Sequence, residues 1–179
     1  IDAAAARIAA SKTFDNATSC SSENAVVVVD AVRERLLEAL AREGGMLLDD
    51  AQTAALEAMH WHGGKLTPRL LAKDIDIVLA ETGLADTAPD GTRFLIAPQT
   101  AIGADHPMSG EKMALFLAFH RAADFDEALD KAVAIQNVMG AGHSLGLHSA
   151  DDARARRIAM EARTCRVIVN QAHCFANGG

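Results

Sequence analysis

The sequence predicts an α/β domain with three layers, in which helices flank an open, mostly parallel sheet. Short apolar runs rich in β-branched residues are typical of strands buried on both faces, and residues 25–29 are the clearest of them. Amphipathic segments of about 12 to 16 residues alternate with these runs, which indicates right-handed βαβ crossovers. No internal repeat, low-complexity tract or interior linker interrupts the alternation. We therefore expect residues 1–179 to form a single domain.

The first half of the chain contains the start and stop signals of several elements. Residues 2–11 are alanine-rich and predict a helix. Asp30 is a suitable cap for a second helix, whose apolar stripe ends before two glycines. Pro68 suits the first turn of a later helix. The helices expected in this half cover 2–11, the segment between Asp30 and Gly44–Gly45, Asp49 or Asp50 to Trp61 with Gly63–Gly64 ending it, and Pro68 to Glu81.

The second half repeats the alternation. Residues 124–139 predict a strongly amphipathic helix, and residues 151–163 a charged one. The strands expected along the whole chain are at 25–29, 46–48, 93–97, 115–120, 143–149 and 166–169.

Composition excludes several classes of protein. Seventeen basic and 24 acidic residues give a net charge of −7, and no basic cluster indicates a nucleic-acid or anionic-membrane partner. No apolar stretch approaches the roughly 20 residues that a membrane span needs. Three cysteines make a disulfide framework improbable and favour a reducing, cytoplasmic setting.

Cys20 is the strongest candidate for a chemical role. It lies among small and polar residues just before the strand at 25–29, whereas a structural cysteine usually has apolar neighbours. Small neighbours allow a carbonyl substrate to approach the sulfur and leave backbone N–H groups to hold an oxyanion. The sequence therefore predicts a nucleophilic thiol at this position.

The stretch from Phe14 to Asn24 resembles the nucleophile loop of the CoA-acylating branch of the aldehyde dehydrogenase superfamily. The residues that match are Phe14, Asp15, Asn16, Cys20, Ser22 and Glu23. Ala17 stands where the family usually has glycine, and Asn24 where glutamine is common. The resemblance extends along nearly the whole chain, and within the branch it is most similar to enzymes that act on sulfoacetaldehyde.

The resemblance implies an NAD- or NADP-dependent oxidation of a short aldehyde, with coenzyme A as the acyl acceptor. Cys20 would form a thiohemiacetal and then a thioester that CoA cleaves. It also implies that residues 1–179 are the cysteine-bearing catalytic domain, that a cofactor-binding domain precedes them and further chain follows, and that the enzyme is a homo-oligomer.

Glu111 is the second candidate. The stretch 106–113 resembles the family segment whose glutamate accepts hydrogen bonds from the nicotinamide ribose, so Glu111 is the expected cofactor-binding residue. A carboxylate suits that role because it can accept from two vicinal hydroxyls. Without the resemblance, a glutamate in this position is an ordinary solvated loop residue.

Other polar residues have weaker claims. Gly142-His143-Ser144 resembles a family segment at the start of a strand, where we expect His143 to fix a strand–loop junction. The segment 172–176 would lie near the aldehyde tail. His60 and His62 flank Trp61, but no third ligand is evident, so we expect a surface pair at a helix end and no metal site.

The remaining cysteines, Cys165 and Cys174, are expected to be a buried thiol and a loop thiol without catalytic roles. Two alternative functions stay open from the residues alone. A cysteine hydrolase would pair Cys20 with a histidine such as His143 or His148. A non-catalytic α/β interaction module would have an incidental cysteine at position 20.

Overall fold

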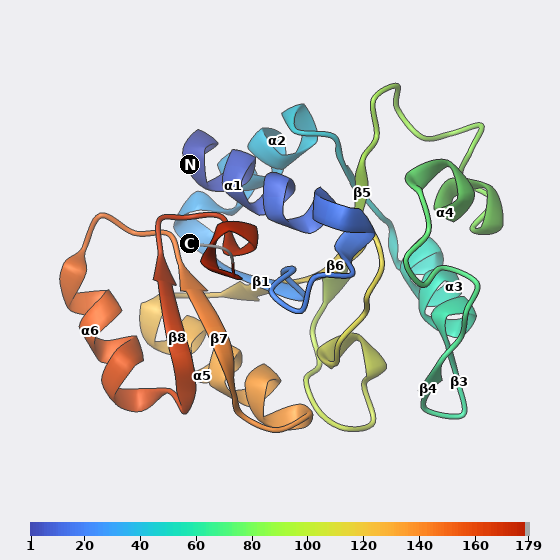
Figure 1. Cartoon of the computed structure of the whole chain (residues 1–179). Coiled ribbons are helices and arrows are strands. Elements are labelled where there is room, and N and C mark those ends of the chain that lie inside the picture. The colour runs from blue at the N-terminus through green and yellow to red at the C-terminus, as the bar shows by residue number, and fades with distance from the viewer. Residues whose placement is uncertain (178–179) are drawn as a thin grey trace.

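The computed structural model describes residues 1–177 and confirms the predicted α/β class. Its centre is a four-stranded parallel sheet with the strand order β1-β6-β5-β2 (Figure 1). These strands are β1 (Ala25–Val29), β2 (Gly45–Leu47), β5 (Phe94–Gln99) and β6 (Phe116–Ala122). The strand β1 has the bounds that its β-branched run predicts. Its register places Val27 opposite His120.

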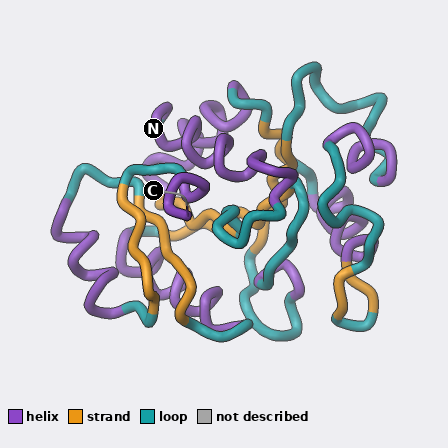
Figure 2. The backbone as a smooth tube through the Cα atoms, in the orientation of Figure 1, coloured by secondary structure: helices purple, strands orange, loops and turns teal. Residues whose placement is uncertain are grey.

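The other strands form two separate pairs. Strands β7 (Gly142–Leu147) and β8 (Thr164–Val169) are parallel, and β3 (Trp61–His62) and β4 (Lys65–Leu66) form an antiparallel hairpin. The helices are α1 (Asp2–Thr13), α2 (Arg33–Arg42), α3 (Asp50–His60), α4 (Ile75–Glu81), α5 (Phe125–Val138) and α6 (Asp152–Glu161). In residues 1–177, short 3₁₀ segments lie in three connections, as η1 (Phe14–Ala17), η2 (Asp30–Val32) and η3 (Pro107–Ser109), and after β8, as η4 (His173–Asn177) (Figure 2).

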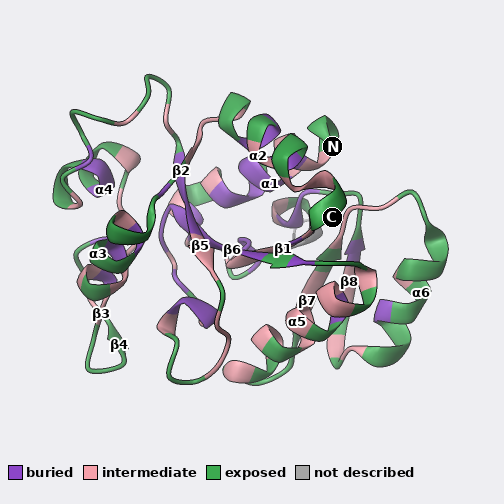
Figure 3. Cartoon of the chain, turned by 180° about the vertical axis from the view of Figure 1, so that it is seen from behind, coloured by how far each residue is buried: buried purple, intermediate pink, exposed green. Residues whose placement is uncertain are grey.

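The central sheet is buried on both faces. Because side chains alternate along a strand, Phe94 and Ile96 of β5 face one core while Leu95 and Ala97 face the other. The first core lies under α1 and α2, and the second lies against α3 and α4. Helix α5 packs along β1 and β6 on the side away from α1 and α2 (Figure 3). Helices therefore cover both faces, as the three-layer prediction requires.

Helix α3 begins with a capping box. The Asp49 side chain accepts a hydrogen bond from the Gln52 backbone at 2.8 Å, and the Gln52 side chain accepts one from the Asp49 backbone at 2.9 Å. Two N–H groups that lack partners inside the helix are thereby satisfied. Of the two aspartates that the sequence offers as the start of this helix, Asp49 is the cap. Among residues 1–177, no helix is both long and apolar enough to cross a bilayer.

The prediction that Asp30 caps the second helix is wrong. Asp30 begins the short segment η2, and helix α2 starts three residues later without a side-chain cap. The carboxylate of Asp30 instead accepts hydrogen bonds from Nε and Nη2 of Arg121 at 2.9 and 3.0 Å. A charge-assisted, two-point contact with the neighbouring strand takes the place of the cap.

The predicted helix from Pro68 is also largely wrong, because only residues 75–81 are helical. The segment before it is tied down by backbone contacts that a helix would not allow. The Thr67 N–H donates to the His60 carbonyl at 2.8 Å, and the Ala72 N–H donates to the Met113 carbonyl at 2.9 Å. Ala72 has a left-handed φ of 56°. Gly63 and Gly64 turn the hairpin β3–β4 and do not end α3, which stops at His60.

Candidate active site

The loop between α1 and β1 presents Cys20 to the solvent. Asp15, Asn16 and Ala17 all have left-handed φ angles, of 49°, 51° and 62°, and they turn the chain back after α1. The Thr18 hydroxyl secures this turn by a hydrogen bond to the Asp15 carbonyl at 2.7 Å. Asn16 Nδ2 donates to Asp74 Oδ1 at 2.6 Å, so the turn is also fixed to the start of α4.

Cys20 lies at the tip of a tight turn within this loop. The Ser22 N–H donates to the Ser19 carbonyl at 2.9 Å, and the hydroxyls of Ser19 and Ser21 are 2.9 Å apart. Cys20 is exposed, whereas Ser21, Ser22 and Glu23 directly after it are buried. The thiol is therefore accessible, while the residues that follow it in the turn are buried. An accessible thiol on a fixed turn suits a nucleophile.

Glu111 lies on the second loop, between η3 and β6. Its side chain is exposed, and its backbone N–H points at Sδ of Met139 at 3.1 Å. The Met139 side chain follows the end of α5 and contacts the backbone of this loop. Burial lowers the pKa of Lys12 to about 7, and the charge of Glu111, after that of Glu23, opposes this lowering.

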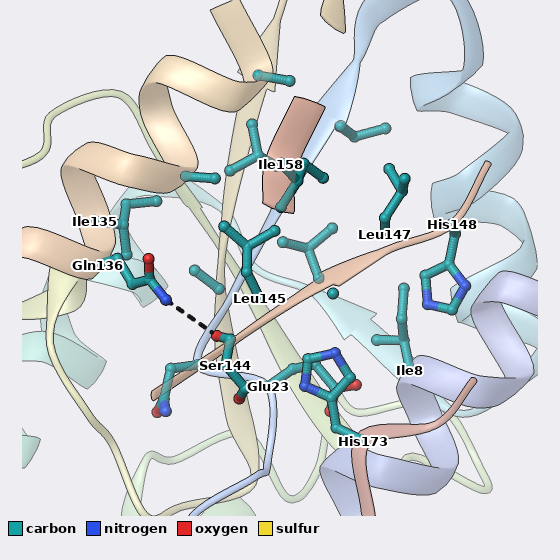
Figure 4. A pocket seen from close by; sticks show the side chains of 18 of the residues that line it. Ile8, Glu23, Ile135, Gln136, Ser144, Leu145, Leu147, His148, Ile158 and His173 are labelled. Atoms are coloured by element: carbon teal, nitrogen blue, oxygen red, sulfur yellow. Dashed lines mark hydrogen bonds between the residues drawn. The ribbon is translucent and has the colours of Figure 1, made fainter. Parts of the chain in front are cut away.

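Cys20 and Glu111 border the same cavity, although they are far apart in the sequence. The cavity has a volume of about 900 Å³ and lies between β1 and α5 on one side and β7 and α1 on the other. Much of its wall is apolar, including Val28, Leu129 and Leu145. Figure 4 shows side chains that line the cavity, where Glu23, Ser144, His148 and His173 lie among apolar side chains such as Leu145 and Leu147. The structure thus places the two sequence-predicted site residues on the lining of one cavity.

Two buried charged residues behind Cys20 were not predicted. Lys12 has no exposed surface, and burial lowers the pKa of its ammonium to about 7 despite the opposing effect of Glu23. Burial raises the pKa of the Glu23 carboxyl to about 7, against the influence of Ser11 and Lys12. Neither had a signature in the sequence, since a lysine in an alanine-rich helix is normally solvated. Only the family pattern around Cys20 included Glu23.

Lys112 is the second buried ammonium, and it follows Glu111 directly. It has no exposed surface, and burial together with the charge of Lys12 holds its pKa well below the ordinary value. Its Nζ donates to the carbonyls of Met108 and Gly110 at 2.7 and 2.8 Å. The loop that presents Glu111 is therefore wrapped around the end of this side chain.

His173 connects the nucleophile loop with the segment after β8. It is 8% exposed, and burial lowers its pKa to about 4, so the ring is neutral at pH 7. The ring lies against Gly146 of β7, where an added Cβ would be 2.1 Å from Nε2. The segment around it is anchored to α1, since the Cys174 N–H donates to the Ser11 hydroxyl at 3.2 Å.

His143 and His148, the two histidines that the sequence offers as a base for Cys20, lie in different surroundings from each other. His143 begins β7 as a junction residue, and its Nδ1 is 2.9 Å from the Ser144 hydroxyl. His148 lies near Arg7 and the chain's first residue, and burial is the main cause of its lowered pKa.

Two further expectations are corrected. His60 is not a surface residue, because it is fully buried, packs edge-on against Trp61 and Phe116, and donates from Nε2 to the Lys112 carbonyl at 2.7 Å. Cys165 is exposed rather than buried, and its thiol donates to the His143 carbonyl at 2.6 Å. In the described part of the chain, no cluster of three or more histidine, cysteine or acidic residues could hold a metal ion.

Comparison with known proteins gives these features a family. No model of a protein family matches the chain. A sulfoacetaldehyde dehydrogenase (acylating) of Cupriavidus necator is 45% identical over 179 residues, which are the whole of this chain and 36% of that protein. The bifunctional aldehyde-alcohol dehydrogenase AdhE of Escherichia coli is 31% identical over 173 residues, which are 95% of this chain and 19% of its own.

Solved structures agree with the sequence relatives. An acetylating aldehyde dehydrogenase from Geobacillus thermoglucosidasius superimposes with a TM-score of 0.92 at 27% identity, over 98% of this chain and 38% of its own. The chain is similar in sequence and in fold to acylating aldehyde dehydrogenases. It spans about a third of the length of the sulfoacetaldehyde dehydrogenase that it matches. The similarity to these proteins extends over nearly the full length of this chain.

Proposed function

We propose that Cys20 is the nucleophile of an NAD(P)-dependent, CoA-acylating aldehyde oxidation. The observation that supports this most is the exposed thiol at the tip of a polar turn, on a cavity that it shares with Glu111. A relative at 45% identity that is named for this reaction class adds weight to the proposal.

In the proposed reaction, the Cys20 thiolate adds to the aldehyde carbon and forms a C–S bond, giving a thiohemiacetal. A bound nicotinamide would accept a hydride from the thiohemiacetal carbon, which is thereby oxidised to the level of a thioester. The thiolate of CoA then attacks the thioester carbonyl, the bond to Cys20 breaks, and Cys20 leaves as a thiolate. Backbone N–H groups of the turn at Cys20 would stabilise the oxyanion of each tetrahedral stage.

Glu111 is the proposed contact to the cofactor's nicotinamide-side ribose. Its carboxylate is exposed at the rim of the cavity, which fits a group that accepts hydrogen bonds from two hydroxyls of a bound molecule. No glycine-rich phosphate-binding motif opens a helix after a strand in this sequence. We therefore propose that residues 1–179 form the cysteine-bearing domain and that another domain of the full-length protein binds the dinucleotide.

Sulfoacetaldehyde is the proposed aldehyde, because two acylating relatives with that name match 98% or more of the chain. NAD or NADP could serve, since the residues that discriminate between them would lie on the other domain. A homo-oligomer in the reducing cytoplasm is the proposed working state, as the reaction needs a free thiol.

The direct test is acylation of the protein by short acyl-CoAs, followed by intact mass and mapping of the modified residue. We expect one thioester, confined to Cys20 and absent from Cys20→Ser. Cys165→Ser is the matched control, because it removes another exposed thiol and should leave the adduct unchanged.

Other results would point to the alternatives. Ester or peptide turnover that needs no nicotinamide would favour the cysteine hydrolase. Failure of the full-length protein to form an adduct at Cys20 would sink the acylating assignment. If aldehyde oxidation by the full-length protein does not extend to sulfoacetaldehyde, only the substrate proposal is lost.

A further inference from the structure

The loops that present Cys20 and Glu111 each rest on a buried ammonium. Lys12 reaches from α1 and donates from Nζ to the backbone carbonyl of Glu23 at 3.0 Å. Lys112 donates to two carbonyls of its own loop, those of Met108 and Gly110. Among residues 1–177, neither ammonium is within 4.0 Å of a carboxylate oxygen. The polar contacts of both side chains are therefore hydrogen bonds to backbone carbonyls rather than ion pairs.

Carbonyl groups in irregular loops need such donors. Loop backbone that is not in a helix or sheet has no ladder of partners, and buried carbonyls without partners are costly. A buried lysine is an expensive donor, because its ammonium must leave water. In each loop its hydrogen bonds fix backbone within a few residues of a candidate site residue.

A single side chain joins the two loops. Asn24 Oδ1 accepts a hydrogen bond from the Lys112 N–H at 2.8 Å, and Asn24 Nδ2 points back at the Ser22 carbonyl at 3.4 Å. The Asn24 carbonyl also accepts from the Ala118 N–H of β6 at 3.1 Å. Asn24 is thus held by the central sheet while its amide bridges the loop of Cys20 and the loop of Glu111.

We propose that Asn24 and Lys112 are positioning residues that hold the thiol of Cys20 and the carboxylate of Glu111 in fixed register. This inference rests on the proposed function, in which one loop carries the acyl group and the other orients the cofactor. Hydride transfer needs both loops in place at once. Acyl exchange between Cys20 and CoA needs only the first.

The inference therefore predicts a split between two half-reactions. In the full-length protein, Asn24→Leu keeps the approximate size of the side chain and removes the acceptor. We expect NAD(P)-dependent aldehyde oxidation to fall by roughly tenfold or more, with a raised KM for the nicotinamide, because misplaced reacting groups lose rate steeply. Acylation of Cys20 by acyl-CoA should change less than about threefold.

Two companion variants separate positioning from simple damage. Asn24→Gln restores an amide and should recover much of the oxidation rate. Asn137→Leu makes the same chemical change on an exposed face of α5 and should leave both half-reactions unaltered. Thermal unfolding of each variant shows whether it is folded, and Asn24→Ala replaces Asn24→Leu if the latter does not fold.

The outcomes are distinct. A selective loss of oxidation supports the inference. Equal loss of both half-reactions, or no loss of either, overturns it. If the wild-type protein itself shows no acylation of Cys20, the proposed function has failed before any variant is compared.

Discussion

Gly146→Ala provides a sharp test of how the segment after β8 is seated. Gly146 lies in β7 with the buried His173 ring against it, and a Cβ there would be 2.1 Å from Nε2 and 2.9 Å from Cε1. Ordinary contacts between such atoms are about 3.5 Å or longer. The ring and the strand must therefore separate by about 1 Å or more, in a place where the ring is 8% exposed and has little room to move.

Overpacking of a well-packed site typically costs about 1–3 kcal/mol, and the closeness of this contact places the expected loss at about 2–3 kcal/mol. For a chain of this size, that loss corresponds to a fall in Tm of roughly 4–12 °C. Ser144→Ala is the control, because it alters a residue on the same face of β7 without adding an atom. It should change the free energy of unfolding by no more than about 0.5 kcal/mol.

The assay is thermal and denaturant unfolding of a double-mutant cycle with His173→Ala. Once the ring is gone, the added methyl has space, so Gly146→Ala should cost less than about 1 kcal/mol in the His173→Ala background. The coupling free energy between the two sites should then be about 1–2 kcal/mol. If Gly146→Ala costs the same in both backgrounds, the reasoning is refuted, and the effect comes from the strand's backbone alone.

Three further predictions concern stability elsewhere. Asp49→Ala removes one side of the capping box at α3 and should cost about 1 kcal/mol in urea unfolding, whereas Asp49→Asn should retain most of it. Burial holds the pKa of His120 at about 4, so the unfolded chain takes up the proton first and stability falls as the pH drops from about 6.5 towards 4. Between pH 7 and 5, wild type should lose about 2 kcal/mol more than His120→Leu, and parallel pH profiles would exclude this histidine as the cause. Ala17→Gly removes a buried methyl worth about 0.8 kcal/mol but also relieves a left-handed φ of 62°, so Tm should stay within about 2 °C of wild type rather than fall as for a typical buried alanine.

The parts of the fold that were predictable have local causes. The run at 25–29 has four consecutive valines after Ala25 and forms β1 with the predicted bounds, and Asp49 with Gln52 three residues later contains its own capping geometry. The prediction of a helix from Pro68 is wrong because distant backbone groups, such as the Met113 carbonyl, accept hydrogen bonds from the N–H groups of this segment. The predicted cap at Asp30 is wrong for a similar reason, because Arg121 on β6 binds the carboxylate that would have capped the helix.

The candidate site divides in the same way. Cys20 and Glu111 were named because the stretches around them resemble family segments, and the structure places both at one cavity. Asn24 and Lys112 owe their importance to a contact between loops that are far apart in the chain, and Lys12 to a contact between α1 and the loop of Cys20. No spacing or periodicity in the sequence predicts that Lys12 and Lys112 are buried, so only the three-dimensional arrangement reveals it.

The fixation of the Cys20 turn has a consequence for the order of folding. Its contacts are with Asp74, through Asn16, and with Lys112, through Asn24. Closing such long loops is entropically costly and slow compared with forming α1. During synthesis and refolding, the thiol therefore stays in an unformed loop until the distant partners have arrived.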